Sequence, residues 1–296
     1  MGTSLADDAA AREVFAAVDD ALDRPLSRLM ADGPEDELTL TRNAQPALMA
    51  VSIAAVRALE ARLDRPLAEL ADLVAGHSLG EYAALTAAGT FDVATAARLL
   101  DLRGAAMQQA VPVGEGAMAA LMGLDTAAVA RLLDDVDGVV DIANDNAEGQ
   151  IVVSGERGAV DAAVAAAREA GAKRVMVLPV SAPFHCRLMA PAAERMRAAL
   201  AETELRAPAV PVVANVTAEP LVDVEAIRAA LVDQVCSRVR WRETMAAFGA
   251  AGVDRVVEAG AGKVLAGLAK RGVKGATVLN VETAADVDAV AAALAG

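Results

Sequence analysis

A serine flanked by glycines is the first chemical feature of the chain, in the stretch AGHSLGEYAAL at residues 75–85. Residues 76–80, Gly-His-Ser-Leu-Gly, fit the pattern G-x-S-x-G, in which a serine occupies a sharp strand-to-helix turn with its hydroxyl exposed. A serine hydroxyl is a weak nucleophile until a base removes its proton. The pattern therefore predicts nucleophilic chemistry at Ser78, provided that the chain supplies this base.

Two histidines, His77 and His185, are the candidate bases. His77 adjoins Ser78 on the tight turn, where neighbouring side chains diverge, so it is badly placed to take the serine proton. His185, in the stretch VSAPFHCRLM, remains as the expected base. A single loop histidine is more often structural than catalytic, but the serine motif and the lack of another candidate reverse that preference. The backbone N–H of Leu79, at the start of the next helix, is placed to donate to an oxyanion.

Arg103 lies in the middle of an apolar helical stripe that also contains Leu99, Leu100, Ala106 and Met107. A guanidinium on a buried face needs an anionic partner, because an unpaired buried charge is strongly destabilising. That partner is either an internal Asp or Glu, the commoner case, or the carboxylate of a substrate held by two parallel hydrogen bonds. The sequence leaves both interpretations open.

Alternating strands and helices position these residues. Residues 7–33 have helical periodicity and are expected to form one helix that ends at Gly33. A short apolar run at residues 73–75 leads into the serine turn, and a helix follows it. Residues 117–183 have the order β-α-β-β-α-β of a ferredoxin-like unit, with a turn at residues 144–149. We therefore predict an α/β fold with a small domain inserted into a larger one.

Composition excludes several classes of function. The net charge of −14 argues against nucleic-acid binding, which needs a basic face. No apolar run approaches the roughly 18 residues of a membrane helix, and the acidic first residues are unlike a signal peptide. Two cysteines are too few for a disulfide framework, and we expect a cytoplasmic protein. One basic cluster on this acidic chain is a candidate docking surface: Lys263, Lys270, Arg271 and Lys274.

The chain resembles the malonyl-CoA:acyl-carrier-protein transacylase family of bacterial fatty-acid synthesis over essentially its whole length. The matching stretches include QPAL (45–48), AGHSLGEYAAL (75–85), LRGAAMQ (102–108), GQIVVSG (149–155), LPVSAPFHC (178–186), PAVPVVANV (208–216) and EAGAGKVL (258–265). The resemblance implies an α/β-hydrolase-like catalytic domain, residues 1–116 and 184–296, with a ferredoxin-like inserted domain, residues 117–183.

The resemblance also implies a role for each matching residue. Ser78 is expected to accept the acyl group, His185 to act as its base, and the Leu79 N–H to stabilise the oxyanion. Arg103 is expected to bind the malonyl carboxylate. Gln234 falls where a glutamine of the family helps to hold the catalytic histidine, through its backbone carbonyl.

Three further positions are carried over in the same way. Gln45 and Asn146 fall at positions that the family places near the acyl pocket. Phe184 resembles the malonyl-selective members, whereas methylmalonyl-selective relatives tend to carry a serine there.

The implied activity is a ping-pong transfer of malonyl from malonyl-CoA to the phosphopantetheine thiol of acyl carrier protein. No cofactor is expected, because the CoA thioester and phosphopantetheine are substrates. The expected partners are malonyl-CoA and an acyl carrier protein, and we expect a monomer.

The chain departs from the family at its start. Family members begin with a strand and a Gly-Gln-Gly-Ser-Gln turn, whose first glutamine supplies a second oxyanion N–H; neither is found in this sequence. The opening MGTSLADD resembles the family just downstream of that turn. We therefore expect Met1 to be an internal methionine of a longer protein, and the chain as written to be catalytically impaired.

Two alternatives remain. A serine esterase or thioesterase would place an acid between the serine and the histidine in sequence, and it has no use for Arg103. A carrier-protein-binding paralogue, disabled by the missing turn, would have no need of Ser78, His185 and Arg103.

Overall fold

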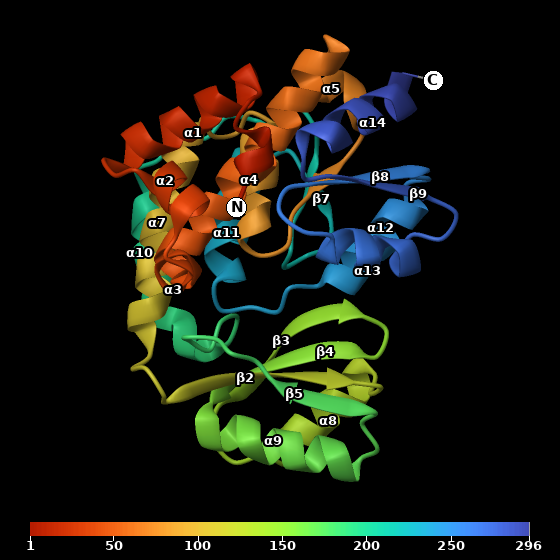
Figure 1. The fold of residues 1–296 in the computed structure, drawn as a ribbon. Helices are drawn as coiled ribbons and strands as arrows, with labels where there is room; N and C mark the ends of the chain where they lie inside the picture. Colours follow the sequence, from red (N-terminus) through yellow and green to blue (C-terminus); the bar gives the residue numbers. More distant parts are fainter. Residues whose placement is uncertain (296) are drawn as a thin grey trace.

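The structure of the protein, a computed structural model, describes residues 1–295. Figure 1 shows a large, helix-rich body that contains both chain termini, and below it a small body built on a single sheet. The chain enters the small body once and leaves it once. This arrangement agrees with the predicted insertion, whereas the exact division at residues 117 and 183 stays a prediction.

Helices make up most of the large body. They are η1 (Thr3–Leu5), α1 (Ala9–Leu22), α2 (Leu26–Asp32), α3 (Glu35–Thr39), α4 (Thr41–Leu63), α5 (Leu67–Leu70), α6 (Leu79–Ala87), α7 (Val93–Ala110), η2 (Arg187–Met189), α10 (Ala190–Ala201), α11 (Val224–Gln234), α12 (Trp241–Ala250), α13 (Val264–Gly272) and α14 (Ala284–Ala295). The central helix is α4, which packs against α1, α6, α7 and α14 and is buried along most of its length. The main hydrophobic core therefore surrounds α4.

The first helical segment differs from the sequence prediction of one helix. Asp23 adopts a left-handed conformation with φ 50°, which ends α1, and α2 begins after Pro25. Proline has no backbone N–H and disfavours the helical conformation of the residue before it, so Pro25 favours the break between α1 and α2. Helix α10, which packs against α7, was not predicted from the sequence.

The small body is a ferredoxin-like unit, as predicted. Its elements are β2 (Gly116–Met122), α8 (Thr126–Asp134), β3 (Val140–Ala147), β4 (Gln150–Glu156), α9 (Arg157–Glu169) and β5 (Arg174–Val177). The strands form one antiparallel sheet in the order β3-β4-β2-β5, and Figure 1 shows both helices on its lower face. A separate hydrophobic core lies between the sheet and these helices.

Strand β3 extends further than the sequence indicated. Residues 145–147, predicted as part of the turn after a strand that ends at Asn144, continue the strand, and only Glu148 and Gly149 form the turn. Two register shifts interrupt the pairing with β4, and the backbone N–H of Asp145 donates to the carbonyl of Val239 at 2.9 Å. Pairing with the large body therefore keeps this polar segment extended.

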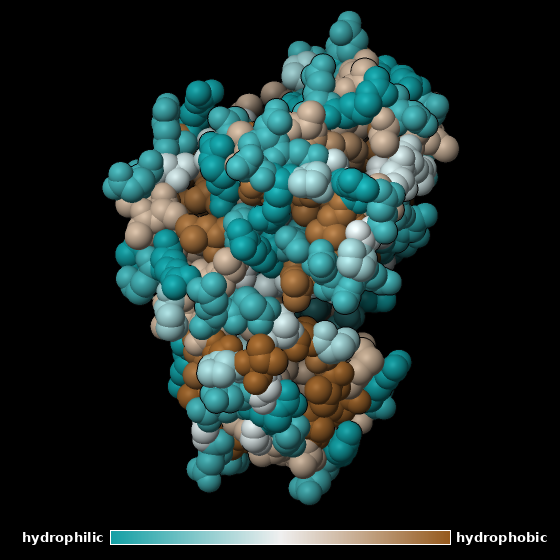
Figure 2. Space-filling view, turned by 60° about the vertical axis from the view of Figure 1, so that its left-hand side comes forward, coloured by the Kyte–Doolittle hydropathy of each residue, from teal (hydrophilic) through white to brown (hydrophobic). Residues whose placement is uncertain are grey.

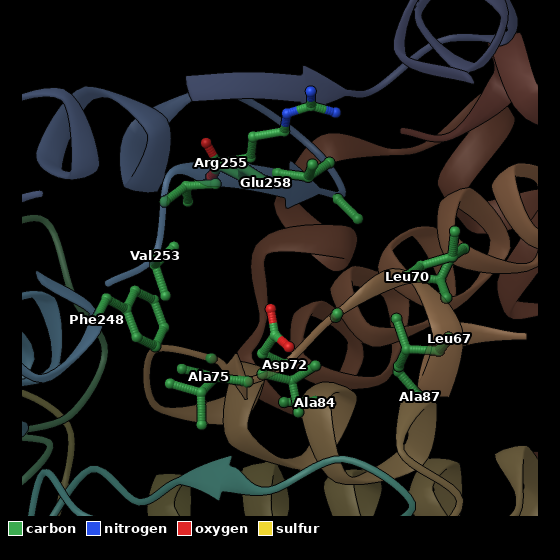
Figure 3. A pocket seen from close by; sticks show the side chains of 18 of the residues that line it. Leu67, Leu70, Asp72, Ala75, Ala84, Ala87, Phe248, Val253, Arg255 and Glu258 are labelled. Atoms are coloured by element: carbon green, nitrogen blue, oxygen red, sulfur yellow. The ribbon is translucent and has the colours of Figure 1, made fainter. Parts of the chain in front are cut away.

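Within residues 1–295, the strands of the large body form two separate sheets. One contains β1 (Val74–Ala75), β6 (Val212–Val213) and β7 (Pro220–Leu221), and the other contains β8 (Arg255–Ala259) and β9 (Thr277–Val281). The pairs β1–β6 and β8–β9 are parallel. A largely apolar cleft of about 530 Å³ separates β1 from β8, and Figure 3 shows Ala84, Phe248 and Val253 on its walls.

Exposed apolar side chains are unevenly distributed over the surface. Figure 2 shows them gathered at the waist between the two bodies and over the small body, while the large body is mainly hydrophilic on this face. Among residues 1–295, no helix combines the length and the apolar character needed to cross a bilayer.

Candidate active site

Ser78 occupies a sharp turn between β1 and α6, as the motif predicted. Its φ of 55° and ψ of −113° are unusual for a residue with a side chain. The turn brings Gly76 so close to α6 that a Cβ at this position would lie 1.8 Å from the Gly80 carbonyl oxygen. Gly76 is therefore required by the close approach of the two backbones.

Asn215, which sequence reasoning missed, holds this turn from the neighbouring strand. It follows β6, and its Oδ1 accepts from the Ser78 backbone N–H at 2.7 Å while its Nδ2 donates to the Gly76 carbonyl at 2.8 Å. A polar residue at the carboxyl end of a parallel strand is a known signal for a site. The sequence alone does not reveal that β6 pairs with β1.

His185 lies against Ser78, with 2.7 Å between its Nε2 and the serine Oγ. Its Nδ1 lies 2.9 Å from the Gln234 backbone oxygen. A carbonyl can only accept a hydrogen bond, so Nδ1 carries the proton and Nε2 is free to accept one from Ser78. The backbone carbonyl of Gln234 therefore lies where it can orient His185, the role that the resemblance predicts for it.

The electrostatic environment keeps His185 neutral. Burial, and after it the positive charge of the nearby Arg103 guanidinium, lower the pKa of His185 to about 3. His185 is 4% exposed, so water does little to offset these effects. The imidazole therefore stays in the form that can accept a proton at neutral pH.

His77 faces away from the serine proton. Its Nε2 lies 2.8 Å from Oδ1 of Asn146, and its ring centroid lies 5.4 Å from that of Trp241. Asn146, expected near the acyl pocket, therefore contacts His77 and is not on the wall of the cavity at Ser78. Asn144, two residues earlier on β3, lies on that wall instead.

Arg103 points at the nucleophile and is only 1% exposed. Its Nη2 donates to Ser78 Oγ at 3.1 Å and to Gln234 Oε1 at 2.8 Å, and its Nη1 donates to Gln45 Oε1 at 2.7 Å. Its Cζ lies 5.7 Å from the centroid of the Tyr82 ring. Among residues 1–295, Arg103 contacts no carboxylate, so the internal ion pair considered from the sequence does not form.

A cavity of about 460 Å³ opens in front of Ser78, His185 and Arg103. Gln45 and Phe184 line it, together with Met107, Met118 and a loop of residues 178–181. The Leu79 backbone N–H has no acceptor within residues 1–295, whereas the next two amides donate to the His77 and Ser78 carbonyls. The Leu79 N–H is thus available to a bound molecule. The larger cleft between β1 and β8 contains neither Ser78 nor His185.

Glu81 is the second buried polar residue that sequence reasoning missed. It directly follows the serine motif on α6, is 2% exposed, and accepts from Gln234 Nε2 at 2.7 Å. The available signal was an acidic residue in the otherwise apolar helix after the motif.

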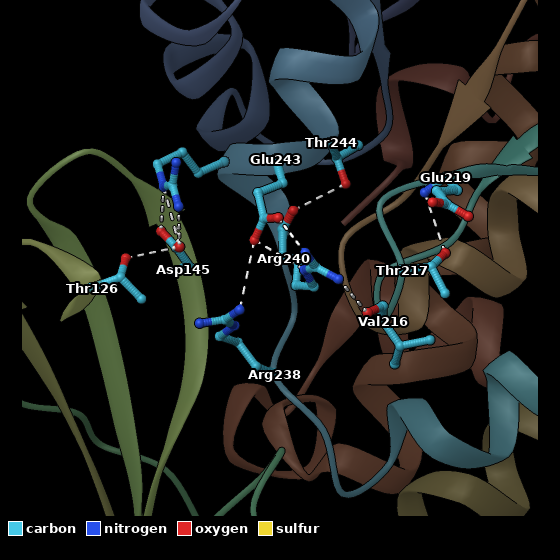
Figure 4. A network of polar contacts seen from close by, with 10 residues as sticks. Thr126, Asp145, Val216, Thr217, Glu219, Arg238, Arg240, Glu243 and Thr244 are labelled. Carbon is cyan, nitrogen blue, oxygen red and sulfur yellow. Dashed lines mark hydrogen bonds and ion pairs between the residues drawn. The ribbon is translucent and has the colours of Figure 1, made fainter. Parts of the chain in front are cut away.

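An ionic network joins the two bodies beside the site. Asp145, fully buried on β3, accepts two hydrogen bonds from Arg242 Nη2 and Nε at 2.9 and 3.0 Å, and one from Thr126 Oγ1 at 2.9 Å. Figure 4 shows this cluster beside a second one, in which Glu243 pairs with Arg238 and Arg240. These contacts fix β3, and hence Asn144, relative to the large body.

The basic cluster proposed for docking lies on and around α13. Lys263, Lys270, Arg271 and Lys274 are all exposed, and Arg271 donates to Gln150 Oε1 on β4 at 3.1 Å. Within residues 1–295, no group of three or more His, Cys, Asp or Glu side chains is arranged to hold a metal ion.

The chain is similar to known proteins along both the large and the small body. The family described as "Acyl transferase domain" matches residues 1–292. The malonyl CoA-acyl carrier protein transacylase of Escherichia coli (strain K12) is 45% identical over 261 residues, which are 88% of this chain and 83% of that protein.

Solved structures agree with this result and confirm the predicted α/β fold. The acyl-carrier-protein-S-malonyltransferase from Bartonella henselae superposes with a TM-score of 0.96 and 52% identity, covering 100% of this chain and 95% of that one. A malonyl-transacylase solved in complex with its type II PKS acyl-carrier protein gives a TM-score of 0.94 and 40% identity, covering 99% and 94% of the two chains.

Proposed function

The chain belongs to the malonyl CoA-acyl carrier protein transacylase family, and we propose that Ser78, His185 and Arg103 carry the activity of that family here. The protein is an acyltransferase that moves a malonyl group from malonyl-CoA to acyl carrier protein, for fatty-acid synthesis. The acceptor is the phosphopantetheine thiol of the carrier. The group passes through a malonyl ester on Ser78, so the two substrates react in turn.

In the first half-reaction, Ser78 Oγ attacks the thioester carbonyl while His185 Nε2 takes the hydroxyl proton. The 2.7 Å separation of these atoms supports this transfer. The Leu79 N–H donates to the oxygen that becomes negative. The carbon–sulfur bond then breaks, and His185 returns the proton to the sulfur of CoA.

The second half-reaction uses the same groups in reverse. His185 takes the proton from the phosphopantetheine thiol, and the sulfur attacks the ester carbonyl. The bond to Ser78 Oγ breaks, and His185 gives the proton back to the serine. His185 accepts and returns the proton in both half-reactions. We therefore propose that the reaction needs no cofactor, since CoA and phosphopantetheine take part as substrates.

Arg103 selects an acyl group that ends in a carboxylate. Two parallel hydrogen bonds from its guanidinium match a carboxylate, and Gln45 and Gln234 hold the guanidinium from both sides. Phe184 on the wall of the cavity limits the space beside the malonyl methylene. A plain esterase would have no use for this buried positive charge.

The observation that carries the proposal is a buried arginine 3.1 Å from a serine hydroxyl that contacts a histidine, with no carboxylate partner for the arginine within residues 1–295. Intact-mass analysis after mixing with malonyl-CoA tests it. We expect one malonyl adduct on Ser78 of the parent and none on Ser78→Ala. An adduct of equal yield on the alanine variant would refute the assignment.

We also propose that the basic cluster on α13 contacts the carrier protein, because acyl carrier proteins are acidic. Reversal of Lys270 and Arg271 to Glu should raise the KM for the carrier and leave acylation by malonyl-CoA unchanged. Arg28→Glu with Arg197→Glu, on α2 and α10, makes the same charge change elsewhere on the exposed surface. An equal rise in KM for both pairs would indicate a general charge effect instead of docking.

A further inference from the structure

We propose that Glu81 is a positioning residue, which fixes the side-chain amide of Gln234 so that its oxygen faces Arg103. This inference rests on the proposed function, because it gives Glu81 a part in the selection of the malonyl group. Glu81 does not contact the cavity at Ser78, and it acts through Gln234.

Glu81 accepts hydrogen bonds from one side-chain donor and one backbone donor. Its Oε2 accepts from Gln234 Nε2 at 2.7 Å and from the Asn215 backbone N–H at 3.0 Å. Gln234 is fully buried and Glu81 is 2% exposed, so water does not compete for these bonds. A buried donor left without an acceptor is costly, which makes Glu81 a strong constraint on both partners.

The orientation of the Gln234 side-chain amide follows from three hydrogen bonds. Its Nε2 donates to Glu81 and to the Ser78 carbonyl at 3.0 Å, while its Oε1 accepts from Arg103 Nη2 at 2.8 Å. A flipped amide would place its oxygen against a carboxylate and a carbonyl, and its NH2 against the guanidinium donors. Glu81 therefore favours the one orientation that holds Arg103 toward Ser78.

Charge supports the same arrangement. Burial lowers the pKa of Arg103, whereas Tyr82 and Glu81 raise it and so favour its charged form. Burial in turn raises the pKa of Glu81 to about 7, against the hydrogen bonds from Asn215 and Gln234 and the positive charge of Arg103. The side-chain amide of Gln234 thus lies between the Glu81 carboxylate and the Arg103 guanidinium, which do not contact each other.

Two variants of Glu81 distinguish its effect on the orientation of the Gln234 amide from its effect on packing. Glu81→Gln keeps an oxygen that can accept from both donors, and Glu81→Met has a similar length without an acceptor. We expect Glu81→Met to lower the malonyl-to-acetyl ratio of acylation rates by about 10–100-fold, the effect of one hydrogen bond to a charged group. We expect Glu81→Gln to stay within about threefold of the parent ratio.

Thr86→Ala is the matched control. Thr86 is buried on the same helix and donates to the Tyr82 carbonyl, away from Gln234, so the ratio should equal that of the parent. A purely structural role of Glu81 would lower both acylation rates equally and leave the ratio unchanged, which would overturn the proposal. A fall as large in Glu81→Gln as in Glu81→Met would also overturn it.

A second measurement needs no variant. The side-chain amide protons of Gln234 in the parent should exchange with solvent much more slowly than those of surface glutamines, because both are held. Rapid exchange would contradict a fixed amide. Malonylation of Ser78 in the parent tests the proposed function separately, so a failure of one idea can be distinguished from a failure of the other.

Discussion

Arg103 is the residue on which acyl selectivity should depend. Arg103→Ala should lower acylation by malonyl-CoA by at least about 100-fold, because two charge-assisted hydrogen bonds are lost. Acylation by acetyl-CoA should stay equal or increase, since the acetyl group leaves no charge unpaired. The ratio of the two acylation rates measures this effect. Equal losses for both substrates would instead assign Arg103 a structural role.

The acid side of the pH profile should be set by the lowered pKa of His185. The base must be neutral, and burial lowers the pKa of His185 to about 3, so its neutral form persists far below the ordinary value of about 6.5. We expect kcat/KM for malonyl-CoA, which reports the free enzyme, to show no loss from this group between pH 8 and about 5. Because the pKa of Glu81 is raised to about 7, the profile is also measured on Glu81→Gln, and a decline centred near pH 6.5 in both proteins would show that His185 titrates normally.

The residues of the site differ in how far sequence could predict them. Ser78 and His185 could be paired before the fold was known, because the chain has only two histidines and one sits on the serine turn. Arg103 was evident as a charge within an apolar stripe, although its partner was not. Glu81 was visible only as an acid in an apolar helix, and the contacts of Glu81 and Asn215 could not be predicted, because they depend on α6, β6 and α11 coming together in three dimensions.

At the scale of elements, the turn between β1 and α6 depends on one glycine far more than on the other. Gly76→Ala should abolish acylation and lower the melting temperature, because the new methyl group would lie 1.8 Å from the Gly80 carbonyl oxygen. Gly80→Ala, on the same turn, places its methyl group with nothing within 4 Å. Its acylation rate should stay close to that of the parent. Equal tolerance of both changes would contradict the close approach of the turn to α6.

Element boundaries were predicted best where local signals decide them. Gly33 ends α2 as expected, and the β-α-β-β-α-β order of the small body was evident from its periodicity. The extension of β3 beyond Asn144 to Ala147 was not, because the partner that stabilises it, Val239, lies in the other body. For the same reason the polar wall of the cavity contains Asn144 and not Asn146.

At the scale of the whole molecule, the cleft between β1 and β8 should accommodate a larger side chain that the packed core cannot. Ala84 faces the cleft from α6, as Figure 3 shows, whereas Ala97 is fully buried on α7. Ala84→Leu should leave the melting temperature nearly unchanged or raise it. Ala97→Leu should lower the free energy of unfolding by about 1–3 kcal/mol, the usual effect of overpacking. Thermal melts of the two variants compare them, and equal losses would show that the cleft is closed in solution.

The buried Asp145 has a consequence for how the molecule comes apart. Its carboxylate is matched only while Arg242 of the large body stays in place, and the backbone of the same residue is bonded to Val239. If the small body separated from the large body, the ion pair with Arg242 and the backbone hydrogen bond to Val239 would be lost together. Calorimetry should therefore record a single endotherm for the whole chain. Amide protons of β3 in the small body should exchange with deuterium no faster than those of α12 in the large body. Both results are expected if the two bodies unfold as one cooperative unit.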